Sequence, residues 1–224
     1  MGLLDSLTKN GNGKPSLGFA EGRMDEKLLQ IPFVFRYIRQ PPAKVLEIGC
    51  SESLLALQLA ALKYNVYGID YLDYGFSHNN LKLIKDDFGA HDFGKDRFDV
   101  IIVMNAVEHF GLQYYKRDEP LDKQADVKAM TKVKEIINPG GQLLFASKYG
   151  ISDLITKDGR PYERVYDDKA LDVLLSTFQI KNTEYYMLSN YNAVRQVEKQ
   201  ELIGTRHYEN TGTYGFICIN AMMP

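Results

Sequence analysis

The sequence predicts an α/β fold in which helices cover both faces of a doubly wound, mostly parallel sheet. Short runs rich in valine, isoleucine and leucine alternate with stretches whose apolar residues recur at helical spacing, as in repeated strand–helix–strand units. The run from Phe98 to Val103 is typical of a parallel strand buried on both faces. With 224 residues, of which 45% are hydrophobic, the chain is long enough for one well-buried core. We therefore expect a single domain over residues 24–224.

The first part of the chain divides into an arm and a helix. Residues 1–23 are rich in glycine, asparagine, serine and lysine, which predicts a flexible arm. Residues 24–40 carry apolar side chains at helical spacing with an interruption at Pro32, and predict an amphipathic helix packed on the sheet edge. Pro41 and Pro42 end this helix and lead into the first strand.

The stretch from Lys44 to Asp70 has the pattern of one complete strand–turn–helix–strand unit. Its first strand carries Glu47 near its end, a tight turn runs from Gly49 to Ser53, and leucines at helical spacing follow. The free N–H groups of a first helical turn form a site for an anion or a polar ligand. Asp70 ends the second strand about 20 residues further on, where a carboxylate binds the hydroxyl groups of a ribose.

A third predicted strand, Leu81 to Ile84, precedes Asp86, Asp87 and Phe88. A carboxylate followed by an aromatic residue suits adenine, because the carboxylate accepts a hydrogen bond from the exocyclic amine and the ring offers an apolar face. A turn that ends the strand would explain one aspartate. It would not explain why an acid follows each of three successive strands, so we expect a nucleoside at these strand ends.

The second half of the chain supplies the remaining elements. After the fourth strand we expect a helix that a Pro-Gly-Gly segment ends, and Asp158-Gly159 predicts a hairpin turn. The expected elements are a strand over 98–103, a helix over 122–138, a fifth strand over 142–147, a helix over 168–178, a sixth strand over 179–188, a polar connection over 189–211 and a seventh strand over 212–222.

Taken in order, these motifs resemble those of the class I S-adenosylmethionine (SAM)-dependent methyltransferases. The run E-I-G-C-S-E-S, residues 47–53, is similar to the family's first motif but has Ser51 and Ser53 in place of glycines. An F-D-V-I strand followed by Glu108-His109 resembles the family's fourth-strand region. The resemblance covers about residues 30–220 and implies a Rossmann-like sheet of seven strands, with the last strand antiparallel and inserted beside the fifth.

The resemblance implies SAM as the cofactor and places it at the ends of the first four strands. Glu47 would serve the methionine ammonium group, and the following turn would approach the methionyl and ribose parts. Asp87 and Phe88 would hold the adenine. The expected cofactor-binding residues are Glu47, Gly49, Cys50, Ser51, Ser53, Asp70, Tyr71, Asp86, Asp87, Phe88 and Asn105. In this family an N-terminal segment can fold over the pocket, so residues 1–23 are a lid or a mobile arm.

The methyl acceptor is expected at the loops after the fourth and fifth strands. His109 is the candidate general base, because an imidazole titrates near neutrality; a packed or capping histidine is the alternative. Glu108 either orients that imidazole or caps a helix. Tyr114 either brackets an acceptor ring or sugar or is an ordinary exposed tyrosine. Lys148, after the fifth strand, is either an acceptor contact or a surface charge.

The histidines show no metal-ligand spacing with each other or with cysteine, so we expect no metal site.

Composition limits the partners. A formal net charge of -2 provides no general field for nucleic acid or anionic membranes, and no stretch approaches the roughly 20 apolar residues that span a bilayer. Two cysteines in or beside apolar strands favour a reducing, cytoplasmic location. Tyrosine-rich loops suit a sugar or an aromatic compound, so we expect O-methyl transfer to a small molecule or glycan precursor.

Two other functions stay open at this point. An NAD(P)-dependent oxidoreductase of a related fold would bind its dinucleotide at the same strand ends, but the usual G-x-G-x-x-G spacing fails at Ser51 and Ser53. A noncatalytic module that has kept the fold is the other alternative, against which the three acids at the strand ends argue.

Overall fold

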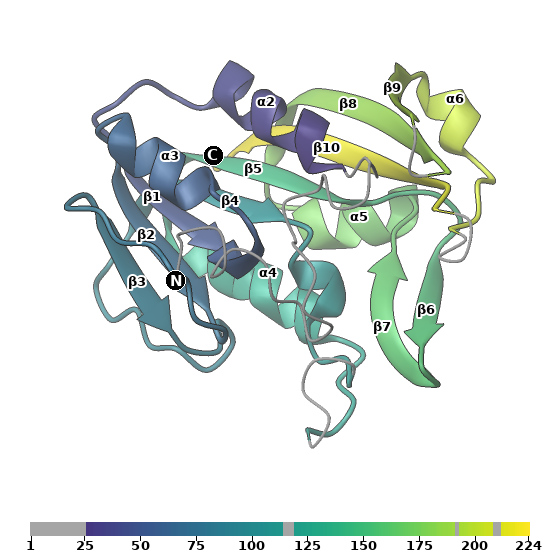
Figure 1. Cartoon of the computed structure of the whole chain (residues 1–224), viewed down its shortest axis with the longest axis horizontal. Coiled ribbons are helices and arrows are strands. Elements are labelled where there is room, and N and C mark those ends of the chain that lie inside the picture. Colours follow the sequence, from purple (N-terminus) through teal and green to yellow (C-terminus); the bar gives the residue numbers. More distant parts are fainter. Residues whose placement is uncertain (1–25, 114–118, 191–192, 208–211) are drawn as a thin grey trace, which may run out of the picture.

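An eight-stranded sheet forms the centre of the molecule. The computed structural model describes residues 26–113, 119–190, 193–207 and 212–224. The strands of the sheet are β1 (Lys44–Ile48), β2 (Asn65–Asp70), β3 (Leu81–Lys85), β4 (Phe98–Met104), β5 (Ile137–Lys148), β8 (Gln179–Ser189), β9 (Ala193–Val197) and β10 (Tyr214–Met222). Their order is β3-β2-β1-β4-β5-β10-β8-β9 (Figure 1). The first five strands of this order are parallel, and β10 is antiparallel to β5 and to β8. The expected doubly wound fold and its antiparallel strand beside the fifth are confirmed.

Helices cover both faces of the sheet, as predicted. The helices α2 (Lys27–Tyr37) and α3 (Leu55–Ala61) pack on one face, and α4 (Ala125–Ile136) and α5 (Asp168–Leu175) on the other (Figure 1). In β4, Ile101 and Val103 join the apolar cluster of the second face, whereas Val100 and Ile102 join that of the first. Both faces of β4 are therefore buried, which explains its uninterrupted apolar sequence.

The first helix differs from the prediction in two respects. Pro32 lies inside α2 and does not interrupt it, because the adjacent Phe33 and Val34 are fully buried and their packing outweighs one lost backbone hydrogen bond. The helix also packs over β10 in the interior of the sheet and not on its edge, and the guanidinium of Arg36 pairs with Glu184 of β8 at 2.6 Å.

The boundary between α4 and β5 lies earlier than predicted. The helix ends at Ile136, and Ile137 already pairs with Phe98 of β4. The register then shifts before Gln142 pairs with Val100, so the Pro-Gly-Gly segment is an irregularity within the strand. Its glycine at 140, with φ of +67°, accommodates the bend.

The connection predicted between the sixth and seventh strands contains the eighth strand. β9 pairs antiparallel with β8 through a turn at Asn190, whose φ is +51°. A short helix, α6 (Lys199–Leu202), follows. As an edge strand β9 is short and mostly exposed, and its apolar residues are interrupted by Arg195 and Gln196, so its sequence shows no strand pattern.

A separate two-stranded sheet confirms the predicted hairpin. It consists of β6 (Asp153–Lys157) and β7 (Arg160–Val165), which are antiparallel (Figure 1). Its turn residues Asp158 and Gly159 have φ of +50° and +74°, as a two-residue hairpin turn requires. None of the helices in the described ranges is long and apolar enough to cross a membrane.

Candidate functional site

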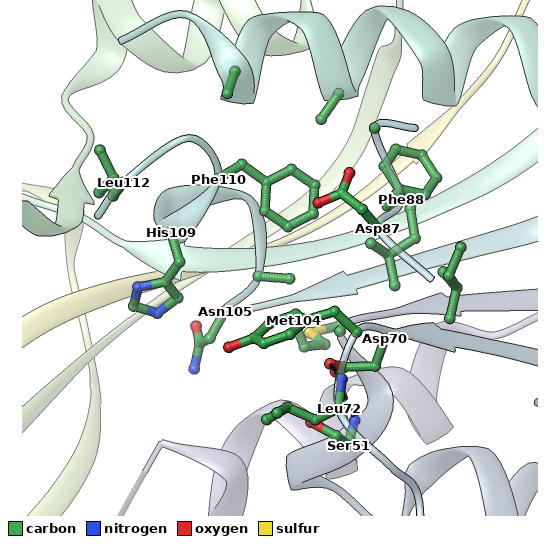
Figure 2. Close-up of a pocket in the computed structure, with 18 of the residues that line it drawn as sticks. Ser51, Asp70, Leu72, Asp87, Phe88, Met104, Asn105, His109, Phe110 and Leu112 are labelled. Carbon is green, nitrogen blue, oxygen red and sulfur yellow. Dashed lines mark hydrogen bonds between the residues drawn. The ribbon is translucent and has the colours of Figure 1, made fainter. Parts of the chain in front are cut away.

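A cavity of about 620 Å³ lies at the carboxyl ends of β1 to β5. Most of its walls come from the ends of these strands and the segments that follow them, where α/β sheets bind ligands, and the rest come from the first part of α2 and from β7. In Figure 2, Asp70, Asp87 and Phe110 surround one end, and Asn105 and His109 lie toward the other. Most of the predicted site residues line it: Glu47, Gly49, Ser51, Ser53, Asp70, Tyr71, Asp86, Asp87, Phe88, Asn105 and His109.

The turn after β1 is fixed by a glycine and by one carboxylate. Gly49 has φ of +77°, and a Cβ there would lie 2.7 Å from the Cβ of Ala106, so a larger residue would collide with the loop after β4. The backbone N–H of Ser51 donates to Oδ2 of Asp70 at 3.0 Å, and that of Leu72 donates to Oδ1 at 2.9 Å. These bonds hold the Asp70 carboxylate in the cavity wall (Figure 2).

Glu47 places a buried carboxyl group beside this turn. The hydroxyl of Ser53 donates to its Oε1 at 2.6 Å and also accepts from the N–H of Leu55 at 3.2 Å, which ties the carboxyl to the start of α3. Its other oxygen, Oε2, has no hydrogen-bond partner in the described ranges. Burial raises the pKa of Glu47 to about 7. A cationic ligand at this point would favour ionisation of the carboxyl group.

The end of the cavity near β3 combines acids with aromatic rings. Oδ1 of Asp87 accepts from the N–H of Ala90, and Figure 2 shows its carboxylate and Phe110 turned toward the same space. Phe88 packs against Phe110 with ring centroids 6.1 Å apart. Oδ2 of Asp86 lies 2.8 Å from Nδ1 of His91, and this hydrogen bond lowers the pKa of Asp86. Asp87 and the rings thus bring a polar and an apolar surface together at this end of the cavity.

His109 lies toward the opposite end, in the short helix η3 (Val107–His109). Its Nδ1 lies 2.7 Å from the carbonyl oxygen of Tyr162. A carbonyl only accepts, so Nδ1 carries the proton and Nε2 carries none. Burial lowers the pKa of His109 to about 4, so the imidazole is neutral at physiological pH. A neutral imidazole in the cavity wall can receive a proton.

The structure corrects the predicted positions of two residues. Cys50 does not line the cavity, because its thiol packs against the second strand: a Cβ on Gly68 would lie 2.8 Å from its Sγ. Glu108 does not line it either. Its side chain is fully buried, both carboxyl oxygens lack partners among the described residues, and burial raises its pKa to about 8. Tyr114 lies outside the described residues, as does the predicted arm, 1–23.

A group of polar residues that the sequence revealed only in part lies at the His109 end. Glu26, just before α2, accepts hydrogen bonds at 2.6 Å on Oε1 from both Nζ of Lys148 and Nδ2 of Asn105, and on Oε2 from the hydroxyl of Tyr214. Gln30 and Asn105 exchange side-chain amide hydrogen bonds of 3.0 and 3.2 Å. Within this group the sequence indicated Asn105, as an expected cofactor contact, and Lys148, as an expected acceptor contact after an apolar strand, whereas Glu26, Gln30 and Tyr214 carried no signal.

The electrostatics of this group depend on one ion pair. Burial opposes the charge of Glu26, but the Lys148 ammonium lowers the pKa of the carboxyl to about 2. Burial likewise opposes the charge of Lys148, but Glu26 keeps the pKa of the ammonium well above its usual value. Both groups are therefore ionised. In the ranges that the structure describes, no cluster of three or more histidine, cysteine or acidic side chains could hold a metal ion.

Comparison with known proteins identifies the family. A family model described as "Methyltransferase domain" matches residues 18–202. No curated protein matches the chain. The chain is similar in structure to the 1,6-didemethyltoxoflavin-N1-methyltransferase of Burkholderia thailandensis, solved with 1,6-didemethyltoxoflavin and S-adenosylhomocysteine (TM-score 0.61, 13% identity, 87% of this chain and 76% of that one).

Two further structures show the same fold. One is the N-methyltransferase NodS of Bradyrhizobium japonicum in complex with S-adenosylhomocysteine (TM-score 0.56, 13% identity, 89% of this chain and 87% of that one). The other is the [4+2]-cyclase SpnF (TM-score 0.59, 15% identity, 88% of this chain and 81% of that one). At sequence identities this low, structural similarity shows only that the fold is shared. Because these neighbours include a cyclase as well as methyltransferases, the fold occurs with more than one chemistry. The family model covers most of the chain, so this protein belongs to the methyltransferase-domain family and is a class I SAM-dependent methyltransferase.

Proposed function

We propose that this protein transfers the methyl group of SAM to a hydroxyl group of a small-molecule acceptor, such as a glycan precursor. The observation that carries the proposal is the arrangement of one continuous cavity. Its β3 end offers Asp70, Asp87 and Phe88 to a nucleoside, and its other end is lined by a neutral imidazole, that of His109.

The residues present fit SAM at the β1 to β3 end. Asp70 would accept from the ribose hydroxyls, and Asp87 from the adenine amine, with Phe88 and Phe110 against the ring. Glu47 has a buried oxygen without a partner in the described ranges, which suits the ammonium of a methionine. Gly49 keeps the turn free of a side chain at its closest approach to the next loop. Ser51 and Ser53 replace the glycines that a dinucleotide site uses, and both are engaged with neighbouring acids.

Methyl transfer requires alignment and, for a hydroxyl acceptor, removal of one proton. Bound SAM would supply an activated methyl group: the acceptor oxygen bonds to the methyl carbon while the carbon–sulfur bond breaks and leaves its electron pair on sulfur. Nε2 of His109 would receive the hydroxyl proton. The hydrogen bond from Nδ1 to the Tyr162 carbonyl supports this role, because it fixes the ring and the tautomer.

Calorimetric titration of the purified protein tests the proposal. We expect S-adenosylhomocysteine and SAM each to bind at one site per chain, and NAD not to bind. Binding of NAD alone would favour an oxidoreductase, and binding of none of the three would favour a noncatalytic module. Either result would overturn the proposed function.

A further inference from the structure

An ion pair at the acceptor end of the cavity is almost completely buried. The side chains of Lys148 and Glu26 are 7% and 13% exposed, their charged atoms lie 2.6 Å apart, and both residues line the cavity. Removing two charges from water costs several kcal/mol per ion, and a buried pair seldom returns more than that in stability. A role in ligand recognition would account for a pair at this position.

The hydrogen bonds of Lys148 are incomplete. An ammonium group has three N–H donors. One donates to Oε1 of Glu26, and a second faces Tyr214, whose ring centroid lies 4.0 Å from Nζ. No further hydrogen bond from Nζ is formed within the parts of the chain that the structure describes, although the buried Glu163, also in the cavity wall, interacts with the ammonium electrostatically. Because Lys148 lines the cavity, its third N–H is available to a ligand oxygen.

The carboxylate of Glu26, by contrast, already accepts three hydrogen bonds within the protein. Its two oxygens accept from Lys148, Asn105 and Tyr214, which come from the ends of β5, β4 and β10. The amide of Asn105 is also paired with that of Gln30. Glu26 therefore holds the ammonium in place and neutralises it, which reduces its repulsion of a cationic sulfonium nearby.

Lys148 and His109 together complement a hydroxyl group. A hydroxyl oxygen accepts one hydrogen bond and donates another. The Lys148 ammonium is a donor, and the unprotonated Nε2 of His109 is a proton acceptor in the wall of the same cavity. An ammonium also stabilises the negative charge that develops on oxygen as the proton leaves, whereas an amine acceptor develops positive charge on nitrogen as it is methylated and gains no such stabilisation.

We infer that Lys148 is a catalytic residue that donates a hydrogen bond to the acceptor oxygen, and that the acceptors are consequently hydroxyl compounds and not amines. The inference rests on the proposed function, in which His109 takes the proton. Glu26 is then a positioning residue, because it acts through Lys148.

Matched double variants test the inference. Lys148→Met with Glu26→Gln removes the ammonium without leaving a buried carboxylate unpaired. The control is Lys44→Met with Asp96→Asn. Lys44 also pairs with an acid at 2.6 Å and lies 4.7 Å from the Tyr67 ring centroid, but it begins β1, far from the strand ends that form the cavity.

Affinity for S-adenosylhomocysteine is measured first, by calorimetry. Formation of S-adenosylhomocysteine from SAM is then followed with pairs of acceptors, each a hydroxyl compound and its amine analogue. The pairs are phenol and aniline, catechol and 1,2-diaminobenzene, and methyl glucoside and methyl glucosaminide. The wild type should methylate at least one hydroxyl member, at least tenfold faster than its amine partner. The double variant should lose at least about 100-fold in turnover with its affinity for S-adenosylhomocysteine within about threefold, and the control should keep its turnover.

Each other result counts against the inference. If the wild type binds S-adenosylhomocysteine but prefers the amine of each pair, or methylates no hydroxyl member, this inference fails while the cofactor assignment stands. Undiminished turnover in the folded double variant would also overturn it. Failure of the wild type to bind S-adenosylhomocysteine would overturn the proposed function itself. If the double variant does not fold, the wild-type rates with the paired acceptors test the inference on their own: preference for a hydroxyl acceptor over its amine partner supports it, and preference for the amine overturns it.

Discussion

At the scale of single residues, burial sets the charge of the groups in and around the cavity. The pKa of His109 falls to about 4, whereas the pKa values of Glu47 and Glu108 rise to about 7 and 8. All three shifts have burial as their largest cause, and burial always disfavours the charged form. In and around the cavity the structure thus holds a neutral imidazole, a Glu108 carboxyl group that is largely protonated at neutral pH, and a Glu47 carboxyl group that is about half protonated.

The raised pKa of Glu108 predicts a loss of stability as the pH rises from about 4.5 to about 8. The unfolded chain releases this proton near pH 4.5 and the folded chain near pH 8, so the folded state becomes progressively less favoured as the pH rises between these values. Relative to Glu108→Gln, the wild type should lose about 4 kcal/mol of unfolding free energy from pH 4.5 to 8. Urea unfolding at a series of pH values measures the difference, and parallel pH profiles for the two proteins would contradict it.

The assignment of His109 as the base predicts a loss of turnover without a loss of cofactor binding. His109→Asn should lower kcat by about 100-fold or more on a hydroxyl acceptor, because the proton loses its acceptor. Affinity for S-adenosylhomocysteine should change by less than about threefold. His78→Asn is a suitable control, since His78 lies in the loop before β3 and does not line the cavity. Equal turnover in both variants would show that His109 is only a packing residue.

At the scale of elements, the β6–β7 hairpin holds the loop that carries His109. Nη1 of Arg164 donates to the carbonyl oxygens of Glu108 and Phe110 at 3.2 and 2.8 Å. Tyr162, on the same strand, accepts from His109. One strand of the hairpin therefore fixes the loop at several points, and that loop lines both ends of the cavity.

Loss of the Arg164 hydrogen bonds to the loop that carries His109 should therefore reduce stability and catalysis together. Arg164→Met leaves three carbonyl oxygens and the Asp126 carboxylate without this partner, which should cost about 2–4 kcal/mol of unfolding free energy. Turnover should fall more than cofactor affinity. Arg97→Met is the control, because Arg97 also donates to two carbonyl oxygens but is exposed. Denaturant unfolding measures the loss of stability and steady-state kinetics measures the loss of turnover. Equal results for the two variants would show that the hydrogen bonds of Arg164 do not hold the loop in place.

Elements were predictable where burial produces a pattern in the sequence. The strands β1 and β4 are buried on both faces and are therefore mostly apolar, without interruption over Val100–Met104 in β4 and apart from Glu47 in the interior of β1. The edge strand β9 is mostly exposed and lacks such a run, and Pro32 resembles a helix stop although packing keeps the helix intact. Local patterns report what a segment can form, whereas packing decides between alternatives.

The same distinction holds for the site. Glu47, Asp70 and Asp87 were predictable because each lies at or just after the end of a recognisable strand, and parallel strands bring their carboxyl ends together. The position of Glu26 was not predictable, because its partner Lys148 lies 122 residues further along the chain. Such contacts arise only when α2 packs across the finished sheet.

At the scale of the whole molecule, the fold brings separate segments into one ligand site. The cavity lies where β1 and β4 are neighbours and successive strands run outward in opposite directions, which is the topological switch point of a doubly wound sheet. A ligand bound there contacts most of the sheet's carboxyl edge, so its binding energy adds to the stability of the whole domain.

This linkage predicts a cofactor-dependent melting temperature. S-adenosylhomocysteine at about 100 times its Kd should add about 2.7 kcal/mol to the unfolding free energy. For a chain of this size that corresponds to a rise in Tm of about 5–10 °C. Differential scanning fluorimetry measures the shift, with NAD at the same concentration as the control. An equal shift with both compounds, or none with S-adenosylhomocysteine, would contradict the prediction.

The central claim is that acids at successive strand ends hold the nucleoside of SAM, and calorimetry of one double variant tests it most directly. Asp70→Asn with Asp87→Asn should weaken the binding of S-adenosylhomocysteine by at least about 100-fold, because both carboxylate contacts are lost. The matched control is Asp73→Asn with Asp92→Asn, two aspartates that do not line the cavity. It should bind like the wild type. Unchanged affinity in the folded Asp70 and Asp87 variant would contradict the account.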